Sequence, residues 1–190
     1  MRIVAGDHRG RALVAPKGHS TRPTADRTRQ ALFNILEHAA WSPGLRGLRV
    51  MDLFAGSGAL GLESMSRAAE FCLFIDQQRP ARDAILQNVA TLKLQAVTRI
   101  LDADARALTA RDPARDPPFD LAFLDPPYGQ GLATPALASL LAGGWLSNRA
   151  IIVVERGVGE VPATAGFAHL DTRTWGVASV DFLRRAGAAA

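Results

Sequence analysis

Short apolar runs alternate with longer amphipathic stretches along most of the chain. Five runs have the length and apolar content of buried strands, namely residues 48–54, 71–76, 97–101, 119–124 and 150–154. Between these runs, apolar residues recur three and four positions apart, which is the spacing of a helix that buries one face. We therefore expect helices at about 24–40, from the glycine-rich stretch after residue 54 to about 67, at 80–92 and around 136–141.

Strands that alternate with helices predict a parallel sheet covered on both faces, which is the doubly wound, Rossmann-like α/β class. Residues 167–175 and 177–183 flank Gly176 and predict two antiparallel strands. The sheet should therefore be mostly parallel with an antiparallel edge strand.

The N-terminal residues predict a separate element. Apolar residues 2–5 and 11–15 flank Gly6-Asp7-His8-Arg9-Gly10, a pattern typical of a β-hairpin. A lone hairpin is marginally stable, so it must lean on the main domain or on a ligand. We divide the chain into residues 1–23, the N-terminal hairpin and loop, and residues 24–190, the α/β domain.

The composition is that of a single globular domain, with 190 residues, 48% hydrophobic and 21% charged. No apolar run approaches the roughly 18–20 residues that span a bilayer, and the first residues lack the apolar core of a signal peptide. Cys72 is the single cysteine and is expected to be a packed small hydrophobe, while four scattered histidines show no metal-ligand spacing. We expect a cytoplasmic monomer that has no membrane segment and needs no metal.

The net charge of +4 is unevenly distributed, which changes the picture of the N-terminal residues. Residues 1–50 hold nine Lys or Arg against three acids, a net charge of +6, so the other residues carry −2. A basic end on an acidic body indicates a polyanion partner, although a solvated arginine-rich surface fits the charge equally well. The candidates for phosphate contact are Arg2, Arg9, Arg11, Lys17, Arg22 and Arg29.

A glycine-rich loop follows the first strand of the α/β domain. Gly56-Ser57-Gly58-Ala59-Leu60-Gly61 matches GxGxxG between a strand and a helix, where glycines let backbone N–H groups approach a ligand closely. Asp76 ends the next strand, 20 residues after Gly56, and can bind ribose hydroxyls. NAD(P), FAD and S-adenosylmethionine all fit this pattern.

Two more acids bear on the choice of cofactor. Asp52, at the end of the first strand, would face a cationic amino acid better than a pyrophosphate, which favours S-adenosylmethionine. Asp104 could accept a hydrogen bond from an adenine amine and Ala105 could donate its N–H to the ring, or Asp104 is a solvated loop acid. The cofactor candidates are Asp52, Phe54, Ala55, Gly56, Ser57, Gly58, Asp76, Asp104, Ala105 and Asp125.

The stretch Asp125-Pro126-Pro127-Tyr128 ends the fourth strand, because proline has no N–H to give to a sheet. It sets a carboxylate, free backbone carbonyls and an aromatic ring at the strand's carboxyl end. This combination suits a planar heterocycle with an exocyclic amino group, although Tyr128 could instead cap the core. The glycine-rich loop, Asp76 and this motif should converge on one crevice. One side would hold a nucleoside cofactor and the other a base with an amino group, and methyl transfer to that amine is the chemistry that needs both. The catalytic candidates are Asp125, Pro126 and Tyr128.

The chain resembles a known family. Asp52–Gly58 and Asp125–Tyr128 resemble the methyltransferases that modify amino groups of nucleic-acid bases. Further matches make it similar, more narrowly, to the bacterial 16S ribosomal RNA guanine-N2 methyltransferases: Gly6, Arg9-Gly10, Arg22-Pro23-Thr24, Asp26-Arg27, residues 31–36, Glu155, Gly176 and Phe182. Asp76 departs from the usual glutamate, Gln78 from an acid and Trp175 from tyrosine.

This resemblance implies a function. S-adenosylmethionine would donate a methyl group to guanine N2 in 16S rRNA, of the guanine-966 type, within a small-subunit assembly. S-adenosylhomocysteine would be the product, and residues 1–23 would contact the RNA. Asp125 and a carbonyl near Pro126 would accept the amine's two N–H bonds while Tyr128 stacks on the base. The alternatives are an adenine-N6 or cytosine-N4 methyltransferase of DNA or other RNA, a nicotinamide oxidoreductase and a non-catalytic RNA-binding module.

Overall fold

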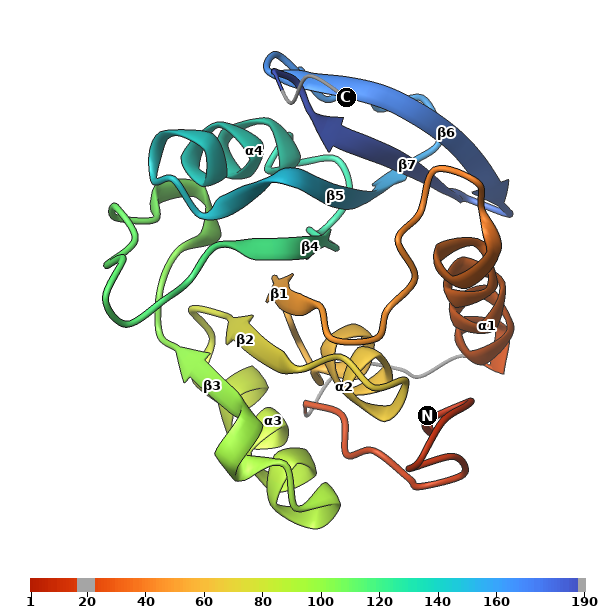
Figure 1. The fold of residues 1–190 in the computed structure, drawn as a ribbon. Helices are drawn as coiled ribbons and strands as arrows, with labels where there is room; N and C mark the ends of the chain where they lie inside the picture. Colours follow the sequence, from red (N-terminus) through yellow and green to blue (C-terminus); the bar gives the residue numbers. More distant parts are fainter. Residues whose placement is uncertain (17–22, 188–190) are drawn as a thin grey trace.

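Seven strands form one sheet in the computed structural model of the protein, which describes residues 1–16 and 23–187 (Figure 1). The strand order is β3-β2-β1-β4-β5-β7-β6. Strands β1 to β5 run parallel, and β7 is antiparallel to both β5 and β6. Their bounds are β1 Arg49–Leu53, β2 Phe71–Ile75, β3 Thr98–Leu101, β4 Phe119–Leu124, β5 Leu146–Gly157, β6 Phe167–Trp175 and β7 Ala178–Arg185.

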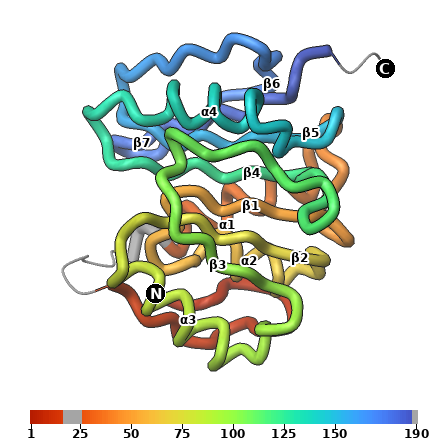
Figure 2. Tube along the Cα trace, turned by 90° about the vertical axis from the view of Figure 1, so that its left-hand side faces the viewer, coloured from red at the N-terminus to blue at the C-terminus, as the bar shows by residue number. Residues whose placement is uncertain are grey.

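The helices cover both faces of the sheet (Figures 1 and 2). On one face, helices α1 (Pro23–His38), α2 (Ala59–Ser66) and α3 (Arg79–Leu92) pack with strand residues such as Val50 and Phe74. On the other, α4 (Ala133–Ala142) and a 3₁₀ turn, η2 (Ala105–Ala107), pack with Met51 and Leu53. A second 3₁₀ turn, η1 (Gln95–Val97), precedes β3. Successive side chains of a strand point to opposite faces, so these two apolar clusters make the doubly wound core that the alternation predicted.

Strand β5 is longer than the pattern predicted, because its ends carry polar residues. Ser147, Asn148 and Arg149 at its start and Glu155 and Arg156 at its end hide the extension from a search for apolar runs. Residues 151–157 nevertheless pair with 178–184 of β7. The ladder with a neighbouring strand, rather than apolar content, sets where β5 ends.

The N-terminal β-hairpin prediction is wrong, because residues 1–16 form no strand and share only an isolated antiparallel bridge between Arg2 and Ala12. The N–H groups of Val4 and Ala5 donate to the carboxylate of Glu63 in α2, at 2.8 and 3.0 Å, rather than to a facing strand. Three backbone hydrogen bonds surround the bridge, from Ile3 to Arg11, from Leu13 to Met1 and from Gly10 to Ile3, but they do not extend into strands. The segment does lean on the main domain, and Ile3 is fully buried in its core.

The loop at 111–118 lies at the edge of the sheet where strands begin. It leads into β4, and Asp116 pairs with Arg99 near the start of β3, with 2.6 Å between Oδ1 and Nη2. The site candidates lie at the opposite, carboxyl edge of the sheet. Buried Cys72 is packed in the core as expected. Within residues 1–16 and 23–187, no helix combines the length and apolar character required to cross a membrane.

Candidate active site

Four acids occupy one row at the carboxyl edge of the sheet. The last paired residues of the parallel strands are in register, in the order Leu101, Ile75, Leu53, Leu124 and Val154. The residues that follow them along the same edge are Asp102, Asp76, Phe54, Asp125 and Glu155. The winding of the sheet reverses between β1 and β4, so the crevice expected for ligands of such sheets lies between Phe54 and Asp125.

The glycine loop is held by Asp76. Phe54, Gly56 and Gly58 all adopt left-handed backbone conformations, with φ of 57°, 56° and 75°, which turns the chain sharply out of β1. One oxygen of Asp76 accepts from the Gly56 N–H at 2.9 Å, and the other accepts from the Gln78 N–H at 2.8 Å. Each oxygen keeps a second lone pair, so Asp76 can shape the loop and still accept from a ribose hydroxyl.

The last glycine of the motif serves packing. A Cβ at Gly61 would lie 2.4 Å from a ring carbon of Phe74 and 2.6 Å from the sulfur of Cys72. These distances are shorter than any real contact, so only glycine lets α2 approach β2 this closely. Gly61 therefore positions the helix that follows the loop, while Gly56 and Gly58 shape the loop itself.

Asp52 lies under the first turn of α2. Its side chain is buried, and its carboxylate accepts from the Gly61 N–H at 2.8 Å. Desolvation raises the pKa of Asp52 to about 7, the Gly61 hydrogen bond lowers it and the charge of Asp76 raises it. The hydrogen-bond partner of Asp52 in the structure is the protein's own Gly61 N–H. A contact between Asp52 and the cationic group of a ligand therefore remains a prediction.

Asp104 is paired with a residue that the sequence did not single out. Both carboxylate oxygens accept from the Arg106 guanidinium, at 2.5 to 2.9 Å, and this hydrogen bonding lowers the pKa of Asp104. The adjacent Ala105 is buried, and the Ser139 hydroxyl of α4 donates to its carbonyl at 2.7 Å. The adenine contact expected of Asp104 and Ala105 would have to share the carboxylate with Arg106.

Two glutamates hold the Asp125–Tyr128 turn. The Tyr128 hydroxyl donates to Oε1 of Glu155 at the end of β5, and the Gly129 N–H donates to Glu160. Pro126 is buried, whereas Asp125 is exposed and Tyr128 keeps 41% of its surface exposed. The sequence marked Glu155 only through the resemblance and did not mark Glu160, because these contacts join segments about 30 residues apart.

The pKa values of Asp125 and Tyr128 are raised in this acidic surrounding. Asp125 as a residue is exposed, but protein atoms crowd around its carboxyl group, and this desolvation raises the pKa of Asp125 well above its ordinary value; the charges of Glu155 and Asp52 raise it further. Desolvation, the Glu155 hydrogen bond and nearby carboxylates likewise raise the pKa of Tyr128. Such a site favours a group that is or becomes positive and disfavours a phosphate. In the described part of the chain, no group of three or more His, Cys, Asp or Glu side chains could hold a metal ion.

The N-terminal segment is tied to the glycine loop through α3 (Figure 2). The Asn88 carboxamide accepts from the Val14 N–H at 2.8 Å and donates to the carbonyls of Val14 and Ser57, both at 2.9 Å. One buried side chain therefore joins the N-terminal segment to the glycine loop. Sequence reasoning missed Asn88 because its partners lie 74 and 31 positions away.

The six candidates for phosphate contact fall into three groups. Arg2, Arg9 and Arg11 are exposed on the N-terminal segment. Arg29 is a correction: only 5% of it is exposed, and it pairs with Asp26 and Glu63 and donates to the Arg2 carbonyl, so it stabilises the fold. Lys17 and Arg22 lie outside the described residues.

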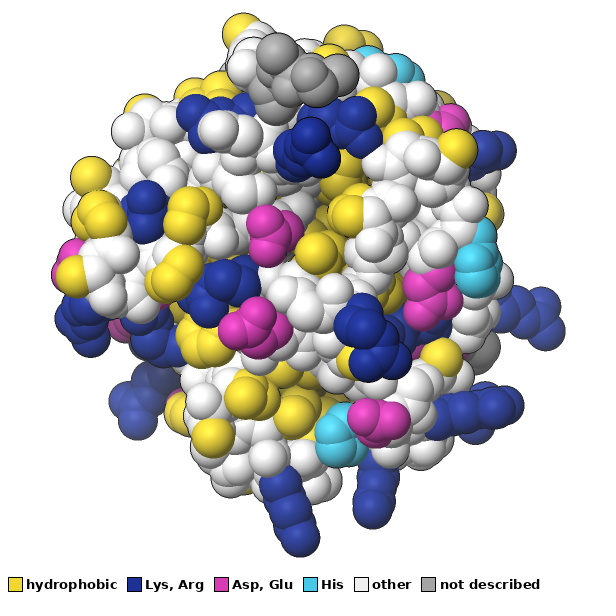
Figure 3. All heavy atoms as spheres, in the orientation of Figure 1, with side chains coloured by type: hydrophobic (Ala, Val, Ile, Leu, Met, Phe, Trp, Pro, Cys, Tyr) yellow, Lys and Arg dark blue, Asp and Glu magenta, His cyan; other side chains and the backbone are white. Residues whose placement is uncertain are grey.

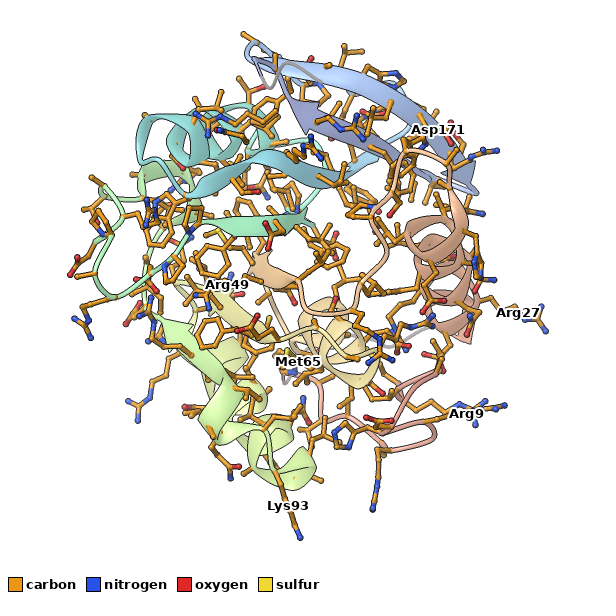
Figure 4. The ribbon with its side chains drawn as sticks, in the orientation of Figure 1. Arg9, Arg27, Arg49, Met65, Lys93 and Asp171 are labelled. Carbon is orange, nitrogen blue, oxygen red and sulfur yellow. The ribbon has the colours of Figure 1, made fainter. Side chains whose placement is uncertain are left out.

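A surface hollow of about 280 Å³ lies between this segment and α1. Arg2, Arg9 and Arg27 line it together with Asp26. Arg9 and Arg27 point away from the body of the protein (Figure 4), and basic side chains project from the same lower right margin in the space-filling view (Figure 3). The sequence did not include Arg27 among the candidates.

Comparisons with known proteins agree with this geometry. A family model described as Conserved hypothetical protein 95 matches residues 1–184. The chain is 37% identical to Ribosomal RNA small subunit methyltransferase D of Escherichia coli, over 86% of this chain and 80% of that protein. It is 35% identical to the Haemophilus influenzae protein of the same name, over 82% and 78%. A solved Escherichia coli structure described as "Putative methyltransferase yhhF" has a TM-score of 0.80 and 32% identity over 97% of each chain.

Proposed function

Because this chain belongs to the family described as Conserved hypothetical protein 95, we propose that it transfers a methyl group from S-adenosylmethionine to guanine N2 in 16S ribosomal RNA. One observation carries the proposal beyond the relatives' names. Across the crevice from the glycine loop, Asp125 offers a carboxylate near Tyr128, and no described residue donates a hydrogen bond to it. The resemblance makes guanine-966 the first nucleotide to examine.

The residues of the crevice fit S-adenosylmethionine better than a dinucleotide. Backbone groups of Phe54, Ala55, Gly56, Ser57 and Gly58 would line the cofactor, Asp76 would accept from its ribose, and Asp104 and Ala105 would meet its adenine. The acidic row would repel a pyrophosphate and attract a sulfonium or an ammonium group. When bound, this cofactor supplies an electrophilic methyl group on a positively charged sulfur.

The protein's own groups would then orient the target amine. The lone pair of guanine N2 is delocalised into the ring, which makes the amine a weak nucleophile. Asp125 and a backbone carbonyl near Pro126 would accept its two N–H bonds and hold it in line with the methyl group. The Asp125 carboxylate would stabilise the positive charge that develops on nitrogen. The raised pKa of Asp125 suits this group to accept the proton that the amine releases.

The RNA would be bound by its phosphates and by the flipped base. Tyr128, held by Glu155, presents a ring on which the base can stack, and removing a base from its stack costs a few kcal/mol. Arg2, Arg9 and Arg11 would contact phosphates, with Arg27 added by the structure. We propose that residues 1–23 form this RNA-contacting part and residues 24–190 the catalytic domain, acting as a monomer on a small-subunit assembly in the cytoplasm.

Mass mapping of methylated nucleotides in ribosomal RNA tests the proposal. We expect one N2-methylguanine in 16S rRNA to be present in cells with the protein, to vanish when its gene is deleted and to return with the wild-type gene but not with Asp125→Ala. An unchanged guanine pattern, or loss of an N6-methyladenine or N4-methylcytosine instead, would overturn it. Calorimetry that finds tight NADH binding and no response to S-adenosylmethionine would overturn the cofactor assignment.

A further inference from the structure

Asp125 and Glu155 lie side by side at the carboxyl edge of the sheet. Leu124 of β4 pairs with Val154 of β5 in a parallel ladder. The residues that follow them, Asp125 and Glu155, are therefore neighbours. Neighbouring strands are about 4.8 Å apart, and residues in register on parallel strands point to the same side. The two carboxylates therefore face the same part of the crevice, at the point where the base amine would lie.

Glu155 has one oxygen engaged and one available. Its Oε1 accepts from the Tyr128 hydroxyl, and no donor to its Oε2 is found among residues 1–16 and 23–187. The side chain is half-buried, and its bond to Tyr128 fixes the carboxylate relative to the aromatic ring. A base stacked on that ring would present its edge to Asp125 and Glu155 together.

The edges of the three amino-bearing bases differ at the atom beside the amine. In guanine, N1 carries a hydrogen, so N1–H and the N2 amine are adjacent donors. In adenine and cytosine, the ring nitrogen beside the amine is an acceptor. A second carboxylate therefore attracts the guanine edge and repels the lone pair of the other two bases.

We propose that Glu155 is the residue that selects guanine, accepting its N1–H through Oε2 while Asp125 accepts from the N2 amine. This inference rests on the proposed function and deepens it. The Asp-Pro-Pro-Tyr motif supplies acceptors for any exocyclic amine and does not distinguish the bases. The second carboxylate, supplied by the neighbouring strand, reads the ring nitrogen.

A base analogue tests this contact. 2-Aminopurine keeps the amine of guanine but lacks O6 and has a bare N1 acceptor, so the hydrogen bond to Glu155 is lost together with any contact to O6. The part that belongs to Glu155 is therefore read from how its replacement changes the preference. After the target position has been mapped, small-subunit RNA is prepared with guanine or 2-aminopurine at that position. We expect the wild-type enzyme to favour guanine by on the order of a hundredfold in kcat/KM, because the analogue sets a lone pair against a carboxylate.

The variant Glu155→Gln should reduce that preference to about tenfold or less, since its amide can donate to the bare N1 of the analogue. Glu160→Gln is the matched control: it loses the same charge five residues further along the chain but accepts from the Gly129 N–H, so it should keep the wild-type preference between the two bases, whatever its effect on turnover. Melting curves check that both variants fold, and equal wild-type rates on the two bases would overturn the inference even if one variant does not fold.

The outcomes separate the two proposals. Equal rates on both bases with the wild-type enzyme, or a wild-type preference in folded Glu155→Gln, would overturn the role of Glu155 and leave the proposed function intact. A wild-type enzyme that methylates no guanine in small-subunit RNA would overturn the proposed function itself.

Discussion

The two halves of the carboxyl edge use their acids differently. On the half formed by β1, β2 and β3, the protein itself supplies a partner for every acid: Asp52 accepts from Gly61, Asp76 from Gly56 and Gln78, Asp104 from Arg106, and Asp102 pairs with Arg82. On the half formed by β4 and β5, Asp125 has no donor among the described residues and Glu155 has only the Tyr128 hydroxyl. The acids of the first half are held by partners within the protein, whereas those of the second keep acceptors that no described residue uses.

The largest expected effect concerns Asp52, an acid of the half formed by β1, β2 and β3 whose ionised form is disfavoured by burial. Its pKa is raised from 3.8 to about 7, so the folded protein holds this proton where the unfolded chain releases it. Stability contributed by the protonated form is therefore complete below about pH 4 and is lost as the pH rises to about 7. Over this window the free energy of unfolding should fall by on the order of 4 kcal/mol on account of this group.

Asp52→Asn keeps an oxygen for the Gly61 N–H and has no charge to desolvate. Its stability relative to the wild type should be near equal at pH 4 and should rise steadily to pH 7, as measured by urea unfolding. Asp83→Asn, at a largely exposed acid of α3, is the control and should show no such trend. A pH-independent difference between Asp52→Asn and the wild type would contradict the assignment.

The second prediction concerns the half formed by β4 and β5. Asp125→Ala should lower turnover on RNA by on the order of a hundredfold or more, because an electrostatic stabiliser of the transition state is lost. The affinity for S-adenosylmethionine and the melting temperature should change little. Asp120→Asn, at the opposite end of the same strand, should keep near-native turnover. Near-native turnover of Asp125→Ala itself would show that the open acceptors are not catalytic.

The third prediction sharpens the comparison from the cofactor side. Asp76→Ala should weaken the binding of S-adenosylmethionine by roughly 1–3 kcal/mol, because it removes an acceptor from the ribose and also releases the Gly56 N–H. Calorimetry measures this change, with Asp83→Ala as a control at an exposed acid. If cofactor affinity is unchanged while RNA methylation falls, Asp76 would belong with the substrate half.

The smallest expected effect concerns the N-terminal segment, which is attached to the half formed by β1, β2 and β3. Replacing Arg2, Arg9 and Arg11 by Ala should weaken RNA binding and flatten its salt dependence, since each lost phosphate contact lowers the slope of log K against log salt by somewhat less than one unit. Cofactor affinity should stay near wild type. Arg115→Ala, at the opposite edge of the sheet, is the control. An unchanged slope in the triple variant would show that these three arginines do not contact RNA phosphates.

Local pattern predicted the fold well because the central strands β1, β2 and β4 alternate between two buried faces, as Val50 and Met51 show. It also located the glycine loop, Asp76 and Asp125, since their types and spacing are local properties of the sequence. It failed where a distant partner decides the outcome. Glu63 accepts from the N–H groups of the N-terminal segment, Glu63 and Asp26 pair with Arg29, and β7 pairs with the polar end of β5.

The contacts of Tyr128 and Asn88 could not be predicted from the sequence for the same reason. Tyr128 meets Glu155 from another strand, and Asn88 meets Val14 from across the domain. No spacing within either segment encodes these pairings. They follow only from the strand order, which brings the ends of β4 and β5 together and lays the N-terminal segment against α3.

The row of acids has a consequence for the exchange of spent cofactor under the proposed function. Donating the methyl group turns a positively charged sulfonium into a neutral thioether of nearly the same shape. The carboxylates of Asp76, Asp125 and Glu155 lie along one edge and would attract the charged form more than the neutral one. If the proposed function holds, the same electrostatic field that recruits the methyl donor would hold the product less tightly, which would favour exchange of product for fresh donor after each turnover.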